Sequence, residues 1–244
     1  IVSELEPADA KGHTGAMRAA AGRLPGVTLY LTGQAATEHD LDPVFAQDLR
    51  KGELLIAVPI ALLLLVWTFG TLSFLIPFLF ALVTIPTTLG IIWILANVME
   101  LTTYLQNMVS LIGLGIAIDY SLLVVYRFRE ELLARQRERA PAGTDPRRVP
   151  VDDDDLLACL RTTMRFAGHA VVFSGLTVAV GLASLMLIPL PYIRSMGLGG
   201  LFIPLVSIAA AVTLLPALLA TLGHRVWSVR LVPQRVLEAR ATEG

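Results

Sequence analysis

Long apolar runs separated by short polar connections dominate the chain after residue 53. A helix of roughly 20 residues crosses the roughly 30 Å hydrocarbon layer of a membrane. Five runs approach or exceed that length, the first being extended by a helical stretch at residues 42–51. They lie at residues 54–69, 72–97, 103–126, 166–190 and 196–222. The pattern predicts five membrane-spanning helices, with Pro77 and Pro86 kinking the second and Pro204 and Pro216 inside the fifth.

The first 45 residues have a different, mixed pattern. Residues 8–24 have a helical composition that ends at Leu24-Pro25-Gly26, and residues 27–32 alternate as a strand with Val27, Leu29 and Leu31 on one face. Such a short segment cannot bury a core alone, so we expect the end of a larger α/β domain. The predicted fold class is mainly α, a polytopic membrane helix bundle of five transmembrane helices with a small α/β remnant.

Composition supports a membrane protein. Hydrophobic residues make up 55% of the 244 positions and charged residues 16%, against about a quarter in soluble domains. A net charge of −1 gives no indication of nucleic-acid binding, and a single cysteine, Cys159, excludes an internal disulfide framework. The chain begins with Ile1 and has no visible signal peptide, so we expect a piece of a longer protein.

The placement of the arginines predicts the orientation of the chain across the membrane. Residues 127–165 contain nine arginines and the tail after Gly223 contains four more, which places both on the cytoplasmic side. Five segments follow from this topology: an extracytoplasmic domain end at residues 1–45, three spans at 46–126, a cytoplasmic loop with an amphipathic helix at 127–165, two spans at 166–222 and a cytoplasmic tail at 223–244.

Asp119 is the principal candidate for chemistry, because it lies well inside the third span. A carboxylate at such a depth costs roughly 2.5–3.5 kcal/mol or more and is usually functional. Its nearest basic neighbour along the helix, Arg127, is roughly 12 Å away along the axis. We expect Asp119, with Tyr120 beside it, to bind a proton or an ion. Gly113 and Gly115 allow another helix to approach closely, and ordinary packing explains them equally well.

Ser174 and Thr177 are candidates for supporting residues in the fourth span. Together with Gly181 and Ser184 they form a small, weakly polar stripe at a spacing of three, four and three. Ser174 and Asp119 each lie eight residues from the cytoplasmic end of their helices, so Ser174 is at the right depth to hydrogen-bond Asp119. Packing with a hydrogen bond to the helix's own carbonyls is the alternative for both hydroxyls.

Other polar residues have structural explanations. His169 lies at a membrane boundary and reads as a solvated histidine, and residues 152–155 form an acidic run that caps a helix beginning near Leu156. Residues 141–150 read as a linker. We find no Walker motif, zinc spacing or catalytic Ser, Cys or His arrangement, so the sequence predicts neither an enzyme nor a cofactor.

Several motifs resemble the MMPL family of the RND transporter superfamily. Residues 113–120 (Gly-Leu-Gly-Ile-Ala-Ile-Asp-Tyr) and 127–131 (Arg-Phe-Arg-Glu-Glu) resemble its fourth helix and cytoplasmic exit. Residues 173–178 resemble the fifth helix, 214–219 the end of the sixth, and 32–36 the end of its first periplasmic domain. The motifs occur in the family's order.

The resemblance implies a fragment of a twelve-helix transporter, containing helices two to six of the first half and the end of its porter domain. Family members place an Asp-Tyr pair on helix four opposite a similar pair on helix ten, and protons are the coupling ion. Asp119 and Tyr120 match the first pair. The implied partners are a second half with the complementary pair, a lipidic or hydrophobic substrate and membrane lipids, and the implied location is a bacterial inner membrane.

Three alternatives remain open, one of them a truncated, inactive gene product. A SecDF-like protein-export motor has a related glycine-rich Asp pattern in its relay helix. A sterol-sensing-like or scaffold membrane domain would use the same helix packing without transport, and Asp119→Asn would then leave its function intact. The sequence does not identify the substrate, the oligomeric state, or proton against sodium coupling.

Overall fold

The computed structural model describes residues 7–21, 30–69, 73, 75–99, 101–102, 104–141, 143–146 and 149–226. Helices dominate these residues, and none of them lies in a β-strand. The chain divides into two compact units, Ile1–Pro59 and Ile60–Gly244, which we describe separately.

The first unit contains helices α1 (Pro7–Ala21) and α2 (Gln34–Asp48) and the π-helical segment η1 (Leu49–Ala57). Arg18 of α1 donates two hydrogen bonds of 2.6 Å to the Asp40 carboxylate of α2. Lys11 and Asp42 form a second ion pair between these helices, with an N–O distance of 2.5 Å. The two pairs join α1 and α2 into a helical hairpin.

The helix predicted at residues 8–24 is therefore present as α1, but the strand predicted at residues 27–32 is not seen. Residues 27–29 lie outside the described residues, and Tyr30, Leu31 and Thr32 are described without strand structure. Helix α2 starts soon after them, with Gly33 at a φ of 121° and the Thr37 amide donating to the Gly33 carbonyl. The residues that follow the predicted strand thus fold back on α1 as a helix, and the α/β remnant is not confirmed.

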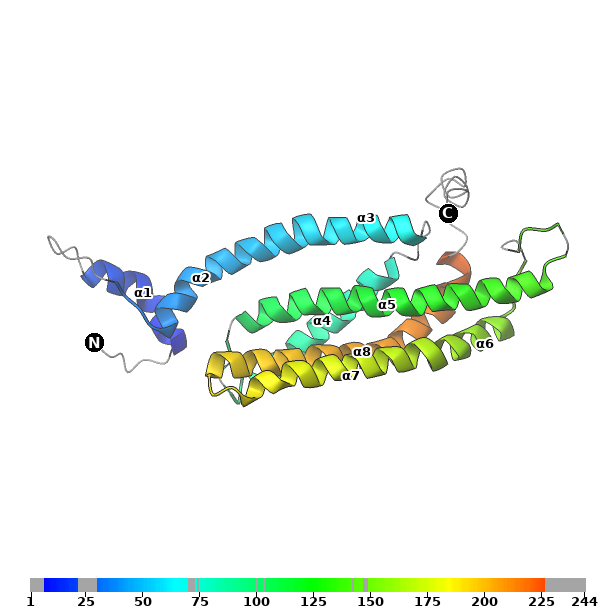
Figure 1. Ribbon diagram of the computed structural model, residues 1–244. Coiled ribbons are helices and arrows are strands. Elements are labelled where there is room, and N and C mark those ends of the chain that lie inside the picture. Colours follow the sequence, from blue (N-terminus) through cyan, green and yellow to red (C-terminus); the bar gives the residue numbers. More distant parts are fainter. Residues whose placement is uncertain are drawn as a thin grey trace. The chain divides into compact units, whose positions relative to one another are not determined.

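The second unit is a bundle in which α4, α5, α7 and α8 run side by side (Figure 1). Its elements are α4 (Leu75–Leu95), α5 (Tyr104–Arg139), α6 (Asp153–Thr163), η4 (Met164–Gly168), α7 (His169–Ala183), η5 (Ser184–Leu187) and α8 (Pro191–Val226). Pro204 and Pro216 lie inside α8, as predicted, and Pro86 lies inside α4. Pro77 falls in the first turn of α4, where its missing N–H has no intrahelical partner to lose.

Four helices among the described residues are long and apolar enough to cross a membrane: Leu75–Leu95, Tyr104–Arg139, Asp153–Leu187 and Tyr192–Thr221. Helix α3 (Val58–Phe69) falls within the first predicted span, but the apolar stretch there, Leu55–Val66, is shorter. The four longer runs therefore match predicted spans, and the count of five is not confirmed.

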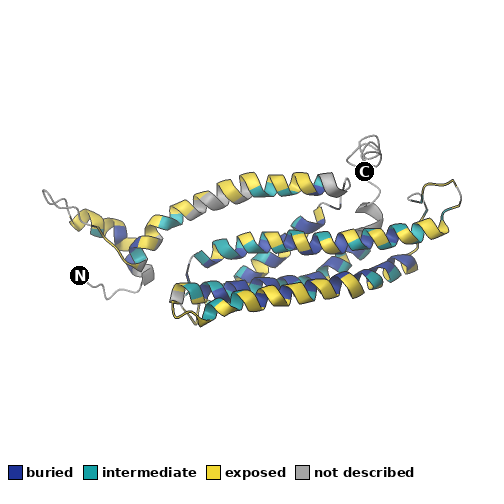
Figure 2. Ribbon diagram, in the orientation of Figure 1, coloured by how far each residue is buried: buried dark blue, intermediate teal, exposed yellow. Residues whose placement is uncertain are grey.

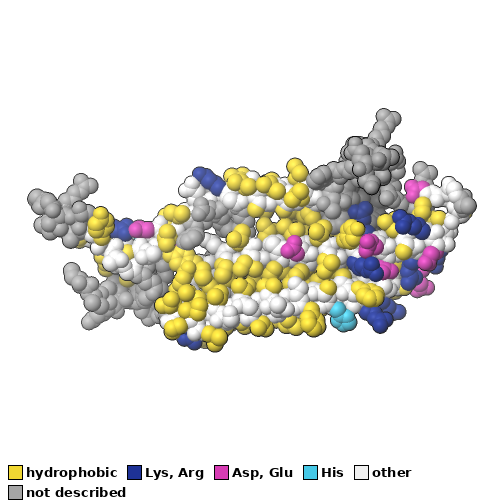
Figure 3. Space-filling model, viewed as in Figure 1, with side chains coloured by type: hydrophobic (Ala, Val, Ile, Leu, Met, Phe, Trp, Pro, Cys, Tyr) yellow, Lys and Arg dark blue, Asp and Glu magenta, His cyan; other side chains and the backbone are white. Residues whose placement is uncertain are grey.

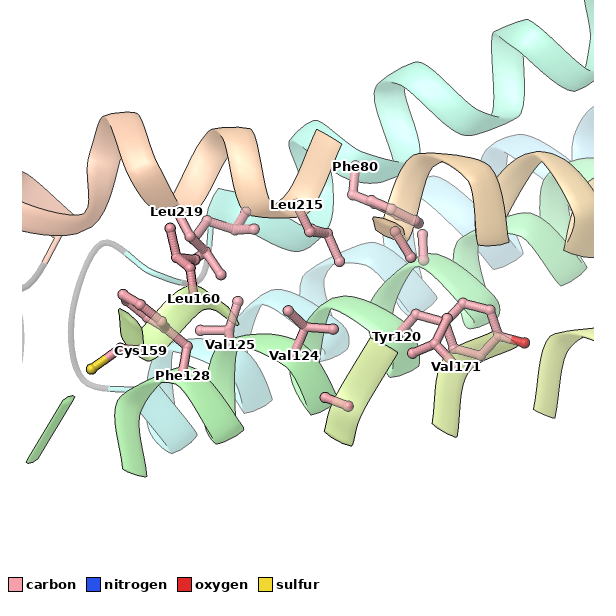
Figure 4. Packing of buried hydrophobic residues seen from close by; sticks show 14 of the residues in the cluster. Phe80, Tyr120, Val124, Val125, Phe128, Cys159, Leu160, Val171, Leu215 and Leu219 are labelled. Atoms are coloured by element: carbon pink, nitrogen blue, oxygen red, sulfur yellow. The ribbon is translucent and has the colours of Figure 1, made fainter. Parts of the chain in front are cut away.

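The core of the bundle is apolar and lies between α4, α5, α6, α7 and α8. Figure 4 shows its largest side chains meeting across the helices, among them Phe80 of α4, Phe128 of α5 and Leu215 of α8. These three side chains are fully buried. Small residues bring the helices close: a Cβ atom on Gly113 would lie 2.9 Å from Ile85 Cγ1 of α4 and 3.0 Å from Ile203 Cδ1 of α8. This packing fixes which face of α5 points inward.

Candidate functional site

The middle of α5 places two polar side chains on different sides of the helix. Tyr120 is buried in the bundle, whereas its neighbour Asp119 is exposed. Successive residues of an α-helix are turned by about 100°, so adjacent positions face different surroundings. Among the described residues, Asp119 makes no hydrogen bond or ion pair. In the sequence, Asp119 and Glu100 are the only charged residues between positions 60 and 126.

Asp119 belongs to a face of α5 that the rest of this unit leaves open. Leu111, Gly115, Asp119 and Leu123 recur at intervals of four, and all four are exposed. A Cβ atom on Gly115 would meet no atom within 4 Å. We call these four residues the Asp119 face. Figure 2 shows such exposed positions along the outer surface of α5 and α7.

Tyr120 points into the bundle, against α7 and α8. A Cβ atom on Gly175 of α7 would lie 2.9 Å from the Tyr120 hydroxyl oxygen and 2.6 Å from Ile208 Cγ1 of α8. Figure 4 shows the Tyr120 ring beside Val171 of α7. The hydroxyl is fully enclosed and has no well-formed hydrogen bond within the described part of the chain. Ser174 lies close enough to interact with it.

Ser174 was expected to lie beside Asp119, but the structure places it beside Tyr120 instead. The depth argument placed Ser174 level with Asp119, the neighbour of Tyr120 in α5. It could not predict the direction in which each side chain points. Thr177 donates a 2.9 Å hydrogen bond to the Phe173 carbonyl, which is the structural alternative considered for it.

The two glycines of the α5 motif have different surroundings. Gly113 is buried where α4, α5 and α8 meet, so close helix packing explains it. Gly115 faces open space on the Asp119 face and packs against nothing in this unit. Only Gly115 is therefore placed to let another segment approach Asp119. Gly175, which encloses the Tyr120 hydroxyl, was not singled out from the sequence, although it directly follows Ser174.

The acidic run lies mostly inside α6, which begins at Asp153 and not near Leu156 as expected, and it does not act mainly as a cap. Asp152 occupies the N-cap position but makes no side-chain capping hydrogen bond. Asp155 is buried and forms ion pairs with Arg135 and Arg139 of α5; the Arg139 Nη2 to Asp155 Oδ1 distance is 2.9 Å. Asp153 and Asp154 lie in the first turn, where they complement the helix dipole as predicted. The carboxylate of Asp155 thus attaches α6 to the extension of α5.

The described residues contain no group of three or more His, Cys, Asp or Glu side chains that would hold a metal ion. His169 is exposed at the start of α7. What the site offers is a single carboxylate in a membrane-length helix, on an otherwise apolar face. Such a carboxylate can bind and release a proton when its surroundings change between wet and dry. The site has no second carboxylate within the described residues.

Comparison with known proteins relates this arrangement to transporters. Residues 3–241 match the MMPL family. The chain is 32% identical over 205 residues to the trehalose monomycolate exporter MmpL3 of Mycobacterium tuberculosis, covering 84% of this chain and 20% of that protein. It is 32% identical over 198 residues to the mycolic acid-containing lipids exporter MmpL11 of Mycolicibacterium smegmatis, covering 81% and 19%. The heme uptake protein MmpL11 of M. tuberculosis is 33% identical over 199 residues, covering 81% and 19%.

Proposed function

The chain belongs to the MMPL family, and from this membership we propose that it works as part of a proton-motive-force-driven exporter of lipids or other hydrophobic molecules in a bacterial inner membrane. Two of the relatives compared above are named as lipid exporters. The chain spans about a fifth of the length of these relatives. Activity therefore belongs, in this proposal, to a complete transporter that contains this segment.

The exposed Asp119 carboxylate is the observation that carries the proposal. It lies on a face of α5 that is otherwise apolar, in a helix long enough to cross a membrane. A carboxylate facing lipid at that depth would cost several kcal/mol. We therefore infer that another part of the transporter, a second half with a complementary Asp-Tyr pair, covers the Asp119 face. Gly115, one turn away, leaves room for it.

In this mechanism Asp119 carries the proton. The carboxylate takes up a proton where its surroundings are open to the extracytoplasmic side and releases it where they open to the cytoplasm, and the alternation rocks the two halves. Tyr120 lies next to Asp119 in α5 and, through its contact with Ser174, connects this part of α5 to α7. A hydrogen bond from Tyr120 to a carboxylate of the second half would require its enclosed hydroxyl to turn outward. Thr177 and Gly113 support packing around the site.

The proposed topology follows the arginine distribution. Residues 127–165 and the tail after residue 223 face the cytoplasm, and residues 1–45 lie outside as the end of a porter domain. Residues 54–69 complete the count of five spans, together with the four longer helices.

Proton-coupled transport by the complete transporter in proteoliposomes tests the proposal. Asp119→Asn keeps the size of the side chain and removes the titratable group, so we expect transport under a proton gradient to fall to background while expression and thermal stability persist. Asp154→Asn makes the same chemical change at an exposed position of α6 and should leave transport intact. Because one relative is named a heme uptake protein, substrate movement is measured in both directions.

Unchanged transport in Asp119→Asn would overturn the relay. If the chain is a scaffold or sterol-sensing-like domain, the wild type should show no proton-driven transport, and Asp119→Asn should behave like the wild type. A protein-export motor predicts instead that proton flow depends on Asp119 while lipid substrates do not move.

A further inference from the structure

Two arginines lack partners among the described residues: Arg161 in the last turn of α6 and Arg165 in η4. Arg161 and Arg165 are both exposed and lie one turn apart, roughly 6 Å along the axis. Among the described residues, neither side chain makes an ion pair or a hydrogen bond. Three other arginines of this end are neutralised within the chain, whereas Arg137 is exposed without an ion pair among the described residues. Of the three, Arg127 pairs with Glu130 and Glu131.

Arg135 and Arg139 are likewise paired, with Asp155. The exposed acidic residues of α6, Asp153 and Asp154, lie at the opposite end of that helix, roughly 10–12 Å from Arg161. Helix α6 is therefore polarised, with its acidic end away from the apolar part of the bundle and its unpaired basic end toward it.

The basic pair lies at the boundary of the apolar region. Arg127 is the first charged residue after the apolar part of α5, and its guanidinium carbon lies 5.5 Å from the centre of the Phe166 ring. Arg165 directly precedes Phe166. Figure 3 shows the charged side chains gathered at this end of α5 and α6, next to a largely hydrophobic flank. Arg165 therefore lies at headgroup depth if the bundle spans a membrane.

An exposed series of side chains continues from the two arginines along the same helix, through His169 to the apolar Phe173. The series Arg161, Arg165, His169 and Phe173 advances four residues at a time, and every member is exposed. Phe173 is 79% exposed, so most of its ring is uncovered by this chain. The π-helical turn η4 lies within the series, and such turns are frequent at functional sites.

We propose that Arg161 and Arg165 bind the phosphate of an anionic phospholipid, whose acyl chain lies along α7 toward Phe173. Guanidinium groups bind phosphate oxygens with paired hydrogen bonds, and basic positions at the cytoplasmic membrane surface bind anionic headgroups. The leaflet is the one at the basic end of the bundle, which is cytoplasmic in the proposed topology. This site requires a membrane-spanning bundle but not proton-driven transport.

The exposed Phe173 beyond the arginines favours a lipid over a free phosphate ion. A soluble phosphate would use only the two guanidinium groups, whereas a phospholipid also covers the exposed Phe173. Another segment of the complete transporter is the competing occupant of this surface. It would exclude lipid from both the arginines and the phenylalanine.

Lipid binding to the complete transporter, measured by native mass spectrometry with added phosphatidylglycerol or phosphatidylcholine, tests this site. We expect Arg161→Gln and Arg165→Gln each to weaken phosphatidylglycerol binding about fivefold, and the pair to weaken it more. Arg137→Gln is the matched control. It removes the same charge from an exposed arginine of α5 that has no ion pair among the described residues.

Phosphatidylglycerol binding should exceed phosphatidylcholine binding in the wild type, and Arg137→Gln should leave that difference unchanged. Arg165→Lys, which keeps the charge and loses the paired geometry, should retain part of the affinity. Equal loss in Arg137→Gln would show diffuse attraction and overturn the site. So would full competition by inorganic phosphate, or a wild type that binds the two lipids equally because another segment covers the surface.

Discussion

The Tyr120 hydroxyl of α5 lies against the backbone of Gly175 in α7, where a Cβ atom would come within 2.9 Å of the hydroxyl oxygen. Any larger residue at position 175 must therefore push the tyrosine or α7 aside. Ile208, the other neighbour of that position, would be closer still, at 2.6 Å from its Cγ1, and its β-branched side chain has little freedom to turn away. The relation joins the candidate relay position to a helix more than fifty residues later in the chain.

Gly175→Ala is expected to lower the free energy of unfolding by about 1–3 kcal/mol, because overpacked positions force such displacements. It should also reduce transport by the complete protein, since Tyr120 moves. Gly181→Ala is the control on the same helix, because a Cβ atom there meets no atom within 4 Å. Thermal unfolding in detergent and transport in proteoliposomes measure the two effects. Equal stability of the two variants would contradict the packing seen around Gly175.

Tyr120→Phe should separate stability from transport. The Tyr120 hydroxyl is enclosed without a well-formed hydrogen bond within the described part of the chain, so its removal should change the unfolding free energy by less than about 1 kcal/mol. If the hydroxyl serves the proton relay, proton-coupled transport falls nonetheless. Tyr126→Phe makes the same change at an exposed position of α5 and should alter neither quantity.

A loss of stability of more than about 2 kcal/mol in Tyr120→Phe would reveal a strong buried hydrogen bond that the structure does not have. Full transport at wild-type stability would remove Tyr120 from the proposed relay and leave Asp119 to act alone.

The positions of the long helices could be predicted because they depend on the length and position of apolar runs. Helix α4, at Leu75–Leu95, lies within the predicted run at residues 72–97. Directions of side chains could not be predicted in the same way. Asp119 and Tyr120 are turned by about 100° from each other on one helix. Tyr120 faces α7 and α8 while Asp119 stays exposed, and that difference depends on residues far away in the sequence.

Ion pairs between residues far apart in the chain could not be predicted from the sequence pattern either. The acidic run at residues 152–155 has the composition of a helix start, which is where the structure places it. Nothing local indicates that Asp155 in particular would turn inward to arginines 16 and 20 residues earlier. The predicted strand at residues 27–32 is not confirmed, since residues 27–29 lie outside the described residues and residues 30–32 have no strand structure.

Asp155→Asn is expected to loosen the attachment of α6 to α5. The carboxylate is buried and accepts hydrogen bonds from Arg135 and Arg139, so its neutralisation should lower the unfolding free energy by about 1–3 kcal/mol. Asp154→Asn, one residue earlier and exposed, should cost less than about 0.5 kcal/mol. Hydrogen exchange in α6, together with thermal unfolding, reports the difference. Identical exchange in the two variants would show that the ion pairs do not hold α6 in place.

The α1–α2 hairpin should respond to acid through Asp40. The hydrogen bonds from Arg18, followed by that from His39, lower the pKa of the Asp40 carboxyl from its ordinary value of 3.8 to about 2. A lowered pKa means that the pair supports the hairpin above about pH 4 and that this support is lost as the pH falls toward 2. The contribution is small and sensitive to salt, since both side chains are exposed.

Arg18→Gln should therefore raise the pKa of Asp40 back toward 3.8, as followed by carboxyl carbon chemical shifts in NMR with labelled aspartate. Lys11→Gln removes a cation from the same helix but leaves the partner of Asp40 in place, so it should leave that pKa near 2. High salt should raise the pKa of Asp40 in the wild type only part of the way toward 3.8, because the paired hydrogen bonds persist when the charges are screened. An Asp40 pKa near 3.8 in the wild type would show that the hairpin is not held by this pair.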